Sequence, residues 1–180
     1  MVYVFLANGF EEIEALTPVD ILRRADVEVQ TVGIGSNIIR GAHGIPVITD
    51  LDANEIKLDE KIEMIILPGG MPGTVNLEGN GNVQKAIDFC LNNNKYISAI
   101  CAAPSILGHK GILDGKNATC FPGFENELGK ACYSDELVIN DEKITTAKGA
   151  GAAVKFALKL VELLVSKDKS DALEASLQCK

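Results

Sequence analysis

Short apolar runs alternate along the chain with longer stretches in which apolar and polar residues are mixed. Residues 2–6 and 64–67 are apolar without interruption, and the turn-forming sequences Asn8-Gly9 and Pro68-Gly69-Gly70 follow them closely. Continuous apolar runs of this length are typical of strands buried on both faces of a sheet. The pattern predicts strands at residues 2–6, 27–34, 64–67, 97–100, 118–120 and 138–147, and a small hairpin or excursion at 41–49.

The mixed stretches predict helices at residues 83–91, 102–108 and 152–165. A further helix lies before residue 24, and Pro18 allows two beginnings for it. Thr17 can cap a helix with Pro18 in its first turn. If the helix instead begins earlier, Pro18 cannot donate to the carbonyl of Glu14 and the helix kinks there. Either way we expect irregular backbone near Glu14.

Strands alternating with helices predict an α/β fold with a mostly parallel sheet and helices on both faces. The length of 180 residues fits one domain. We place that domain at residues 1–167 and expect 168–180 to be a polar, loosely held C-terminal tail.

Composition narrows the class of protein. With 47% apolar residues, 23% charged residues and a net charge of −8, the chain is unsuited to a nucleic-acid or anionic membrane surface. No run is long enough to cross a membrane, and the chain opens directly on a predicted strand. Five scattered cysteines with no CxxC pair predict neither a disulfide framework nor a zinc site. We therefore expect a cytoplasmic protein with reduced thiols, without metal or cofactor.

Residues 96–105 (YISAICAAPS) carry the clearest chemical signal. A predicted strand ends in Cys101, a predicted helix follows at once, and Ala99, Ala102 and Ala103 are small. This order is typical of a nucleophile elbow, a sharp turn that exposes one side chain. A thiol at a helix start is expected to have a lowered pKa. The alternative is a buried apolar cysteine that merely ends a core strand.

In parallel sheets, ligands bind at the carboxyl ends of the strands. Four predicted loops meet there, at residues 8–14, 68–73, 101–103 and 148–151. Backbone N–H groups of Gly69, Gly70 and Ala102 are candidate donors to an oxyanion, although two glycines after a strand also suit a plain tight turn. Residues 148–151 (KGAG) are only a weak match to a dinucleotide-binding loop.

The chain has two histidines, and neither is an obvious base for Cys101. His109 lies about two helical turns beyond the cysteine, and His43 lies in the 41–49 excursion. We expect both on the surface, Cys90 and Cys120 in the core, and Cys132 and Cys179 at the periphery. A carboxylate from residues 8–14 is then the expected partner of Cys101.

Five segments together resemble the DJ-one (ThiJ/PfpI) family, in the branch of the parkinsonism-associated protein deglycase. They are residues 6–14 (LANGFEEIE), 18–25 (PVDILRRA), 67–70 (LPGG), 99–104 (AICAAP) and 146–151 (TAKGAG). The resemblance implies a flavodoxin-like sandwich and a homodimer, for which Ile13 and the first helix are the expected contact. It also implies Cys101 as reactive cysteine, Glu14 as its carboxyl partner, and Gly69, Gly70 and Ala102 as oxyanion donors.

The resemblance further implies a cofactor-free glyoxalase or deglycase that acts on methylglyoxal-type carbonyls or on glycated amines and thiols. Many family members carry a histidine at the position of Phe121, which weakens a third possibility, an amidase or peptidase. A redox sensor or chaperone that uses oxidation of Cys101 is the main alternative. The sequence does not separate it from the enzyme.

Overall fold

A central sheet of seven strands runs through the computed structural model, which describes residues 1–179. Its strand order is β10-β11-β7-β6-β1-β2-β5, and every neighbouring pair is parallel except the antiparallel pair of β10 and β11. The predicted α/β class and mostly parallel sheet are therefore confirmed. The strands are β1 (Val2–Leu6), β2 (Val29–Gly33), β5 (Leu51–Asp52), β6 (Met64–Leu67), β7 (Tyr96–Ile100), β10 (Val138–Asp141) and β11 (Ile144–Ala147).

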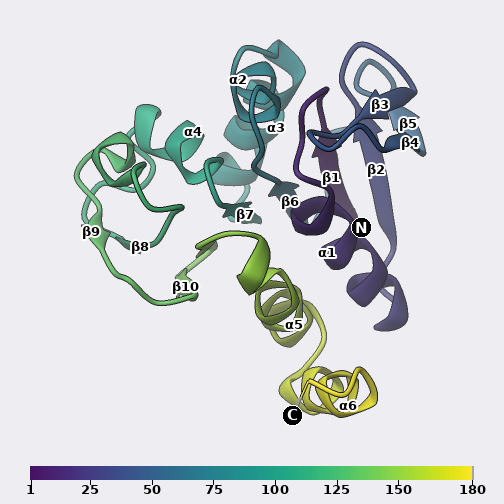
Figure 1. Ribbon diagram of the computed structural model, residues 1–180, viewed down its shortest axis with the longest axis vertical. Coiled ribbons are helices and arrows are strands. Elements are labelled where there is room, and N and C mark those ends of the chain that lie inside the picture. Colours follow the sequence, from purple (N-terminus) through teal and green to yellow (C-terminus); the bar gives the residue numbers. More distant parts are fainter. Residues whose placement is uncertain (180) are drawn as a thin grey trace.

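Helices cover both faces of this sheet (Figure 1). Successive side chains of a strand point to opposite faces, so Tyr3 and Phe5 enter one core while Val2 and Val4 enter the other. Helices α2 (Gly73–Glu78), α3 (Gly81–Asn92) and α4 (Pro104–His109) supply apolar residues to the first core, and α1 (Glu12–Arg24) and α5 (Ala153–Leu164) to the second. Short 3-10 helices lie at η1 (Glu125–Leu128) and η2 (Ala150–Ala152).

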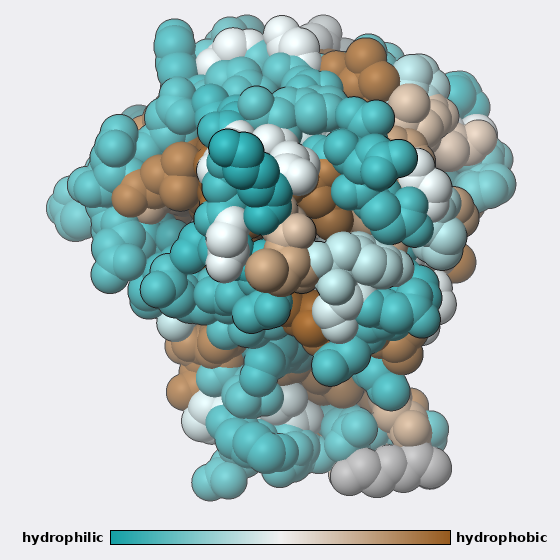
Figure 2. Space-filling view, turned by 90° about the vertical axis from the view of Figure 1, so that its left-hand side faces the viewer, coloured by the Kyte–Doolittle hydropathy of each residue, from teal (hydrophilic) through white to brown (hydrophobic). Residues whose placement is uncertain are grey.

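Two small sheets lie outside the central one. Strands β3 (Ile38–Arg40) and β4 (Pro46–Ile48) pair antiparallel, as the predicted hairpin at 41–49 suggested. Strands β8 (Asn117–Ala118) and β9 (Cys132–Tyr133) pair parallel. The face that carries β8 and β9, at the left of Figure 1, is mostly hydrophilic, with hydrophobic colour in separate areas (Figure 2).

Helix α1 begins before Pro18, so the second of the two predicted beginnings is observed. Glu11, not Thr17, is the N-cap residue, and its carboxylate accepts a hydrogen bond from the N–H of Glu14 at 2.7 Å. Pro18 lies inside the helix and has no N–H to donate to the carbonyl of Glu14. The early beginning places Glu14 in the first turn of α1, at the carboxyl edge of the sheet.

The segment after Ser166 differs from the loosely held tail that we expected. It forms α6 (Lys167–Ser176), capped by the hydroxyl of Ser166. The Ser170 hydroxyl donates to the carbonyl of Leu158 in α5 at 2.8 Å, and Leu173 packs against the core beneath α1 and α5. The sequence pattern did not predict this helix, because too few of its side chains are apolar to produce a helical periodicity.

Other differences concern the bounds of elements. Residues 138–147 form two strands and a turn, and helix α2 was not predicted. Within residues 1–179, none of the helices is long and apolar enough to cross a membrane.

Candidate functional site

Cys101 lies in the sharp turn that joins β7 to α4. Its φ is 67°, a left-handed conformation that costs a residue with a side chain about 1–2 kcal/mol. The surrounding backbone holds the turn: the N–H of Cys101 donates to the carbonyl of Ala147 at 2.8 Å, and its carbonyl accepts the N–H of Phe121 at 2.8 Å. Backbone strain of this kind occurs where a side chain must be presented. The turn has the geometry of the predicted nucleophile elbow.

Glu14 lies beside Cys101 and is almost fully buried, with 1% of its surface exposed. Its carboxyl group forms a side-chain hydrogen bond with Cys101 and accepts backbone N–H groups from Gly69 and Ala150. The Gly69 N–H lies 3.0 Å from Oε2. The structure thus brings together the two residues that the resemblance paired, and it holds the carboxyl group from three separate segments.

The backbone N–H of Gly69 has a different partner from the oxyanion expected for it. Its N–H is engaged by Glu14, so it orients the carboxyl group and leaves the other predicted donors for an oxyanion. A Cβ on Gly69 would lie 2.6 Å from Oε2 of Glu14 and 2.7 Å from Cβ of Cys101. Any side chain at this position would therefore push the pair apart.

Gly70 and Ala102 face the sulfur of Cys101. The backbone N–H groups of both residues form hydrogen bonds to it. Gly70 has a φ of 88°, which favours glycine. Two donors to the sulfur are also suited to bind an oxygen on a carbon bonded to it, which is the role that the resemblance implies for them.

Burial dominates the electrostatics of the pair. It raises the pKa of Glu14 to about 7, the negative charge of Glu11 acts in the same direction, and the hydrogen bonds from Cys101, Gly69 and Ala150 act against it. Burial also raises the pKa of the Cys101 thiol, as does the neighbouring Glu14, while the N–H groups of Ala102 and Gly70 lower it. The lowered thiol pKa expected from the helix start is therefore wrong, because desolvation and a neighbouring carboxylate outweigh the turn.

The two groups titrate as a coupled pair rather than independently. Near neutral pH Glu14 is partly ionised, and an ionised Glu14 can accept the proton of the thiol. The arrangement is suited to nucleophilic addition in which a carboxylate takes the place of the usual histidine base.

Neither histidine belongs to this site. His109 contacts Glu78 at 2.6 Å and Glu127 at 2.8 Å, and His43 is exposed and contacts Glu12 at 2.8 Å. At the position where many family members have histidine, Phe121 presents a half-exposed ring.

One group in the described part of the chain has a spacing that could hold a metal ion, namely Glu11, Glu12 and His43. Its members already have partners. One oxygen of Glu12 accepts the backbone N–H of His43 at 2.9 Å and the other contacts the imidazole at 2.8 Å, while Glu11 caps α1. The group ties the β3–β4 hairpin to the start of α1.

Sequence reasoning missed the role of Ala150. Residues 148–151 lie at the predicted edge of the sheet, where the sequence indicates only a weak match to a nucleotide-binding loop. In the structure the N–H of Ala150 binds the Glu14 carboxyl group. A backbone donor leaves no residue type to recognise, so only its position after a strand could have pointed to it.

The other cysteines lie where we expected them. Cys90 and Cys120 are fully buried, and Cys132 and Cys179 are exposed. Cys101 is the one of intermediate exposure, so it combines access with a built environment.

Comparison with known proteins agrees with the resemblance in the sequence. Residues 1–163 match the model of the DJ-1/PfpI family. Glutathione-independent glyoxalase DJ-1 of Schizosaccharomyces pombe is 31% identical, over 98% of this chain and 97% of that protein. The structure of oxidized DJ-1 from Toxoplasma gondii matches with a TM-score of 0.93 and 32% identity, over 98% of this chain and 97% of that one.

Two curated relatives are much longer than this chain. Protein DJ-1 homologs A and B of Arabidopsis thaliana are 31% and 33% identical over 98% and 94% of this chain. The chain spans 46% and 39% of their lengths, less than half of each.

Proposed function

The chain belongs to the DJ-1/PfpI family, and from that premise we propose that it is a cofactor-free glyoxalase that converts α-oxoaldehydes such as methylglyoxal to 2-hydroxy acids. The observation that carries the proposal is the pairing of Cys101 with a buried carboxyl group of pKa about 7. A group with that pKa can both accept and give a proton at neutral pH. The name of the Schizosaccharomyces pombe relative supports the same reaction.

The first step is addition of sulfur to the aldehyde. The Cys101 sulfur bonds to the aldehyde carbon, the thiol proton passes to ionised Glu14, and the carbonyl electron pair moves onto oxygen. The N–H groups of Gly70 and Ala102 stabilise that oxyanion. Glu14 then returns its proton to the oxygen, which gives a hemithioacetal and restores the carboxylate.

The second step moves hydrogen from one substrate carbon to the other. Glu14 removes the proton of the carbon bonded to sulfur, and the electron pair forms an enediolate with the neighbouring carbonyl. Glu14 then protonates the second carbon, and the hydroxyl proton on the first carbon moves to the oxygen of the second. The first carbon thereby becomes a thioester carbonyl and the second carries the hydroxyl group. Water hydrolyses the thioester, releasing the 2-hydroxy acid and the thiol. One carbon is oxidised and its neighbour reduced, so no external redox partner is required.

The direct test measures loss of methylglyoxal and formation of lactate. We expect turnover by the parent protein and a loss of roughly a thousandfold or more in Cys101→Ala, because the nucleophile is removed. Cys132→Ala is the matched control, since it removes an exposed thiol far along the chain from the elbow. A parent protein that forms no lactate above the Cys101→Ala background contradicts the proposal.

The same addition could act on early glyoxal adducts of amines and thiols. This deglycase activity would be separated from glyoxalase activity by supplying a preformed hemithioacetal under conditions in which free methylglyoxal is trapped. Release of lactate under those conditions supports the deglycase, and its absence leaves the glyoxalase alone.

Oxidation of Cys101 is a second candidate function. Cys101 is partly exposed, and a relative of similar fold is described as oxidized. We propose that mild peroxide converts Cys101 to the sulfinate and that a protonated Glu14 donates a hydrogen bond to it. Intact-mass spectra should show two added oxygens in the parent protein and less of that species in Glu14→Ala. Equal sulfinate in both proteins would exclude Glu14 as the partner.

We also propose a homodimer, formed through the start of α1 and the β3–β4 hairpin. Ile13 is 54% exposed, and Ile45 and Ile48 of the hairpin are 52% and 78% exposed. Sedimentation at micromolar concentration should give a species of twice the 19.2 kDa chain mass. Ile48→Asp should dissociate it, whereas Val75→Asp, at an exposed position on α2, should not.

The five free thiols fit a reducing compartment such as the cytoplasm.

A further inference from the structure

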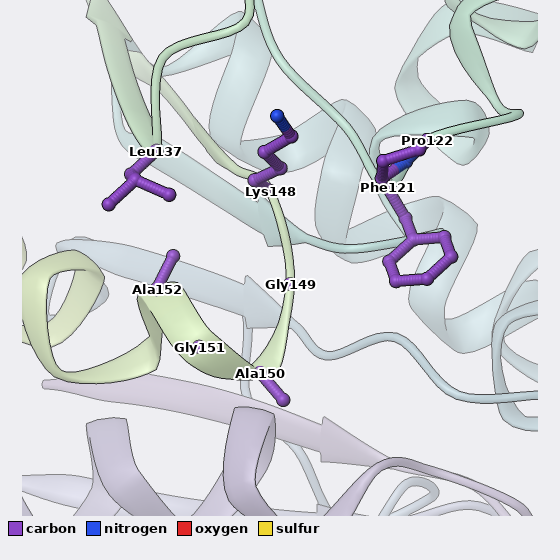
Figure 3. Close-up of a pocket in the computed structure, with 8 residues that line it drawn as sticks. All are labelled: Phe121, Pro122, Leu137, Lys148, Gly149, Ala150, Gly151 and Ala152. Atoms are coloured by element: carbon purple, nitrogen blue, oxygen red, sulfur yellow. The ribbon is translucent and has the colours of Figure 1, made fainter.

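A cavity of about 330 Å³ lies next to the Cys101–Glu14 pair. That volume is within the range of small-molecule sites. Figure 3 shows its lining side chains around the backbone of residues 148–151, with Leu137 and Ala152 on one side and Phe121 on the other. Its lining residues are Phe121, Pro122, Leu137, Lys148, Gly149, Ala150, Gly151 and Ala152.

The lining offers almost no polar side chain to an occupant. Lys148 is its single charged residue, and its ammonium group is paired with the carboxylate of Asp135. In Figure 3 the end of the Lys148 side chain points away from Ala150 and Gly151. Backbone groups of the lining are also engaged, since the Gly149 carbonyl accepts the N–H of Ala152 at 2.8 Å.

Two residues of the cavity wall, Phe121 and Ala150, contact the Cys101–Glu14 pair. Ala150 donates its N–H to Glu14, and Phe121 donates its N–H to the carbonyl of Cys101. A Cβ at Gly149 would lie 3.2 Å from the Phe121 ring and 3.9 Å from Oε1 of Glu14. A substrate whose aldehyde carbon is bonded to Cys101 therefore has this cavity within reach of the group on its second carbon.

We propose that the cavity selects α-oxoaldehydes whose second carbon carries an apolar alkyl or aryl group, and that it rejects substrates with hydroxylated side chains. The inference rests on the proposed glyoxalase function and specifies its substrate class. A hydroxyl group placed against Phe121, Leu137 and Ala152 loses part of its hydration and meets no polar side chain in return, which is unfavourable. An alkyl group gains by leaving water.

The test compares kcat/KM for methylglyoxal, ethylglyoxal, tert-butylglyoxal and hydroxypyruvaldehyde. Ethylglyoxal and hydroxypyruvaldehyde differ only in a methyl or a hydroxyl group at the same place. Each kcat/KM is calculated with the concentration of free, unhydrated aldehyde. It is then divided by the equilibrium constant for addition of a model thiol to that aldehyde, which removes differences in intrinsic reactivity. We expect ethylglyoxal to exceed hydroxypyruvaldehyde, and tert-butylglyoxal to exceed methylglyoxal, by roughly tenfold or more.

Variants locate the preference in the cavity. Leu137→Asn should lower the ratio of tert-butylglyoxal to methylglyoxal by roughly fivefold, because a half-buried apolar contact is replaced by an amide. Leu91→Asn is the matched control, because Leu91 and Leu137 are each 42% exposed and Leu91 lies on α3. Equal or better use of hydroxypyruvaldehyde, or an unchanged ratio in Leu137→Asn, would overturn the proposal.

A binding measurement separates this proposal from the proposed function. If the parent protein turns over none of the aldehydes, the glyoxalase proposal fails, and the cavity is tested with unreactive acids on Cys101→Ala. Trimethylpyruvate should then raise the melting temperature at concentrations where pyruvate does not, and Leu137→Asn should abolish the difference. Equal effects of the two acids would overturn the cavity proposal independently.

Discussion

Cys90 precedes strand β7 and Cys101 follows it, and burial raises the pKa of both thiols although their surroundings differ. Cys90 lies in the last turn of α3 before the strand, is fully buried, and has a pKa raised to about 12 mainly by burial. Cys101 follows the strand, and burial raises its pKa as well. Only Cys101 has backbone donors on its sulfur and a carboxyl partner. Burial alone makes a thiol inert, whereas a buried thiol beside a proton acceptor is suited to react as a nucleophile.

The largest expected effect removes the carboxyl partner. Glu14→Gln keeps the size of the side chain but cannot accept or return a proton, so we expect kcat/KM for methylglyoxal to fall by about 10²–10⁴-fold. Cys90→Ala, which changes the cysteine before β7, should leave turnover unchanged. Lactate formation measures both. If kcat/KM of Glu14→Gln stays within threefold of the parent value, the carboxyl partner does not distinguish Cys101 from Cys90.

The pH dependence of turnover sharpens the same comparison. The proposed mechanism needs Glu14 ionised, and burial raises its pKa to about 7. The rate should therefore rise as pH increases through about 7 and fall below it, measured as kcat/KM between pH 5.5 and 8.5. A flat profile over that range would contradict the role of Glu14.

Alkylation by iodoacetamide, read by mass spectrometry, tests the thiols themselves. Because the charge of Glu14 raises the pKa of Cys101, Glu14→Gln should shift its labelling to lower pH. Cys90, which has no exposed surface, should stay unlabelled in both native proteins. A shift to higher pH in Glu14→Gln would reverse the assigned electrostatics.

The smallest expected effect concerns the backbone at the two cysteines. At position 101 the φ of 67° favours glycine, so Cys101→Gly should be more stable than Cys101→Ala by about 1–2 kcal/mol. At position 90, inside α3, Cys90→Ala should be more stable than Cys90→Gly by about 1 kcal/mol. Urea unfolding of the four variants measures the free energies. If the alanine variant were the more stable one at both positions, the backbone of the elbow would not be strained.

Local patterns determined the strands, the hairpin and the elbow around Cys101. Short apolar runs bounded by turn residues such as Asn8-Gly9 and Pro68-Gly69 are typical of buried strands. A cysteine between a strand and small residues is typical of a sharp turn. The sequence also left the beginning of α1 open, since it allowed a helix capped by Thr17 or one that begins earlier. The structure has the earlier beginning, which puts Glu14 within hydrogen-bond distance of the Gly69 N–H.

Only the tertiary structure decided the chemistry of the pair. The pKa values of Glu14 and Cys101 depend on how much water β6, β7, α1 and residues 148–151 exclude together, and these segments are far apart in the sequence. The loss of Gly69 as an oxyanion donor and the role of Ala150 arise from backbone groups, which no residue type encodes. The sequence pointed to Cys101 through its place between a strand and small residues, and the resemblance pointed to Glu14. Desolvation and donor geometry are sums over distant neighbours, and folding alone brings those neighbours together.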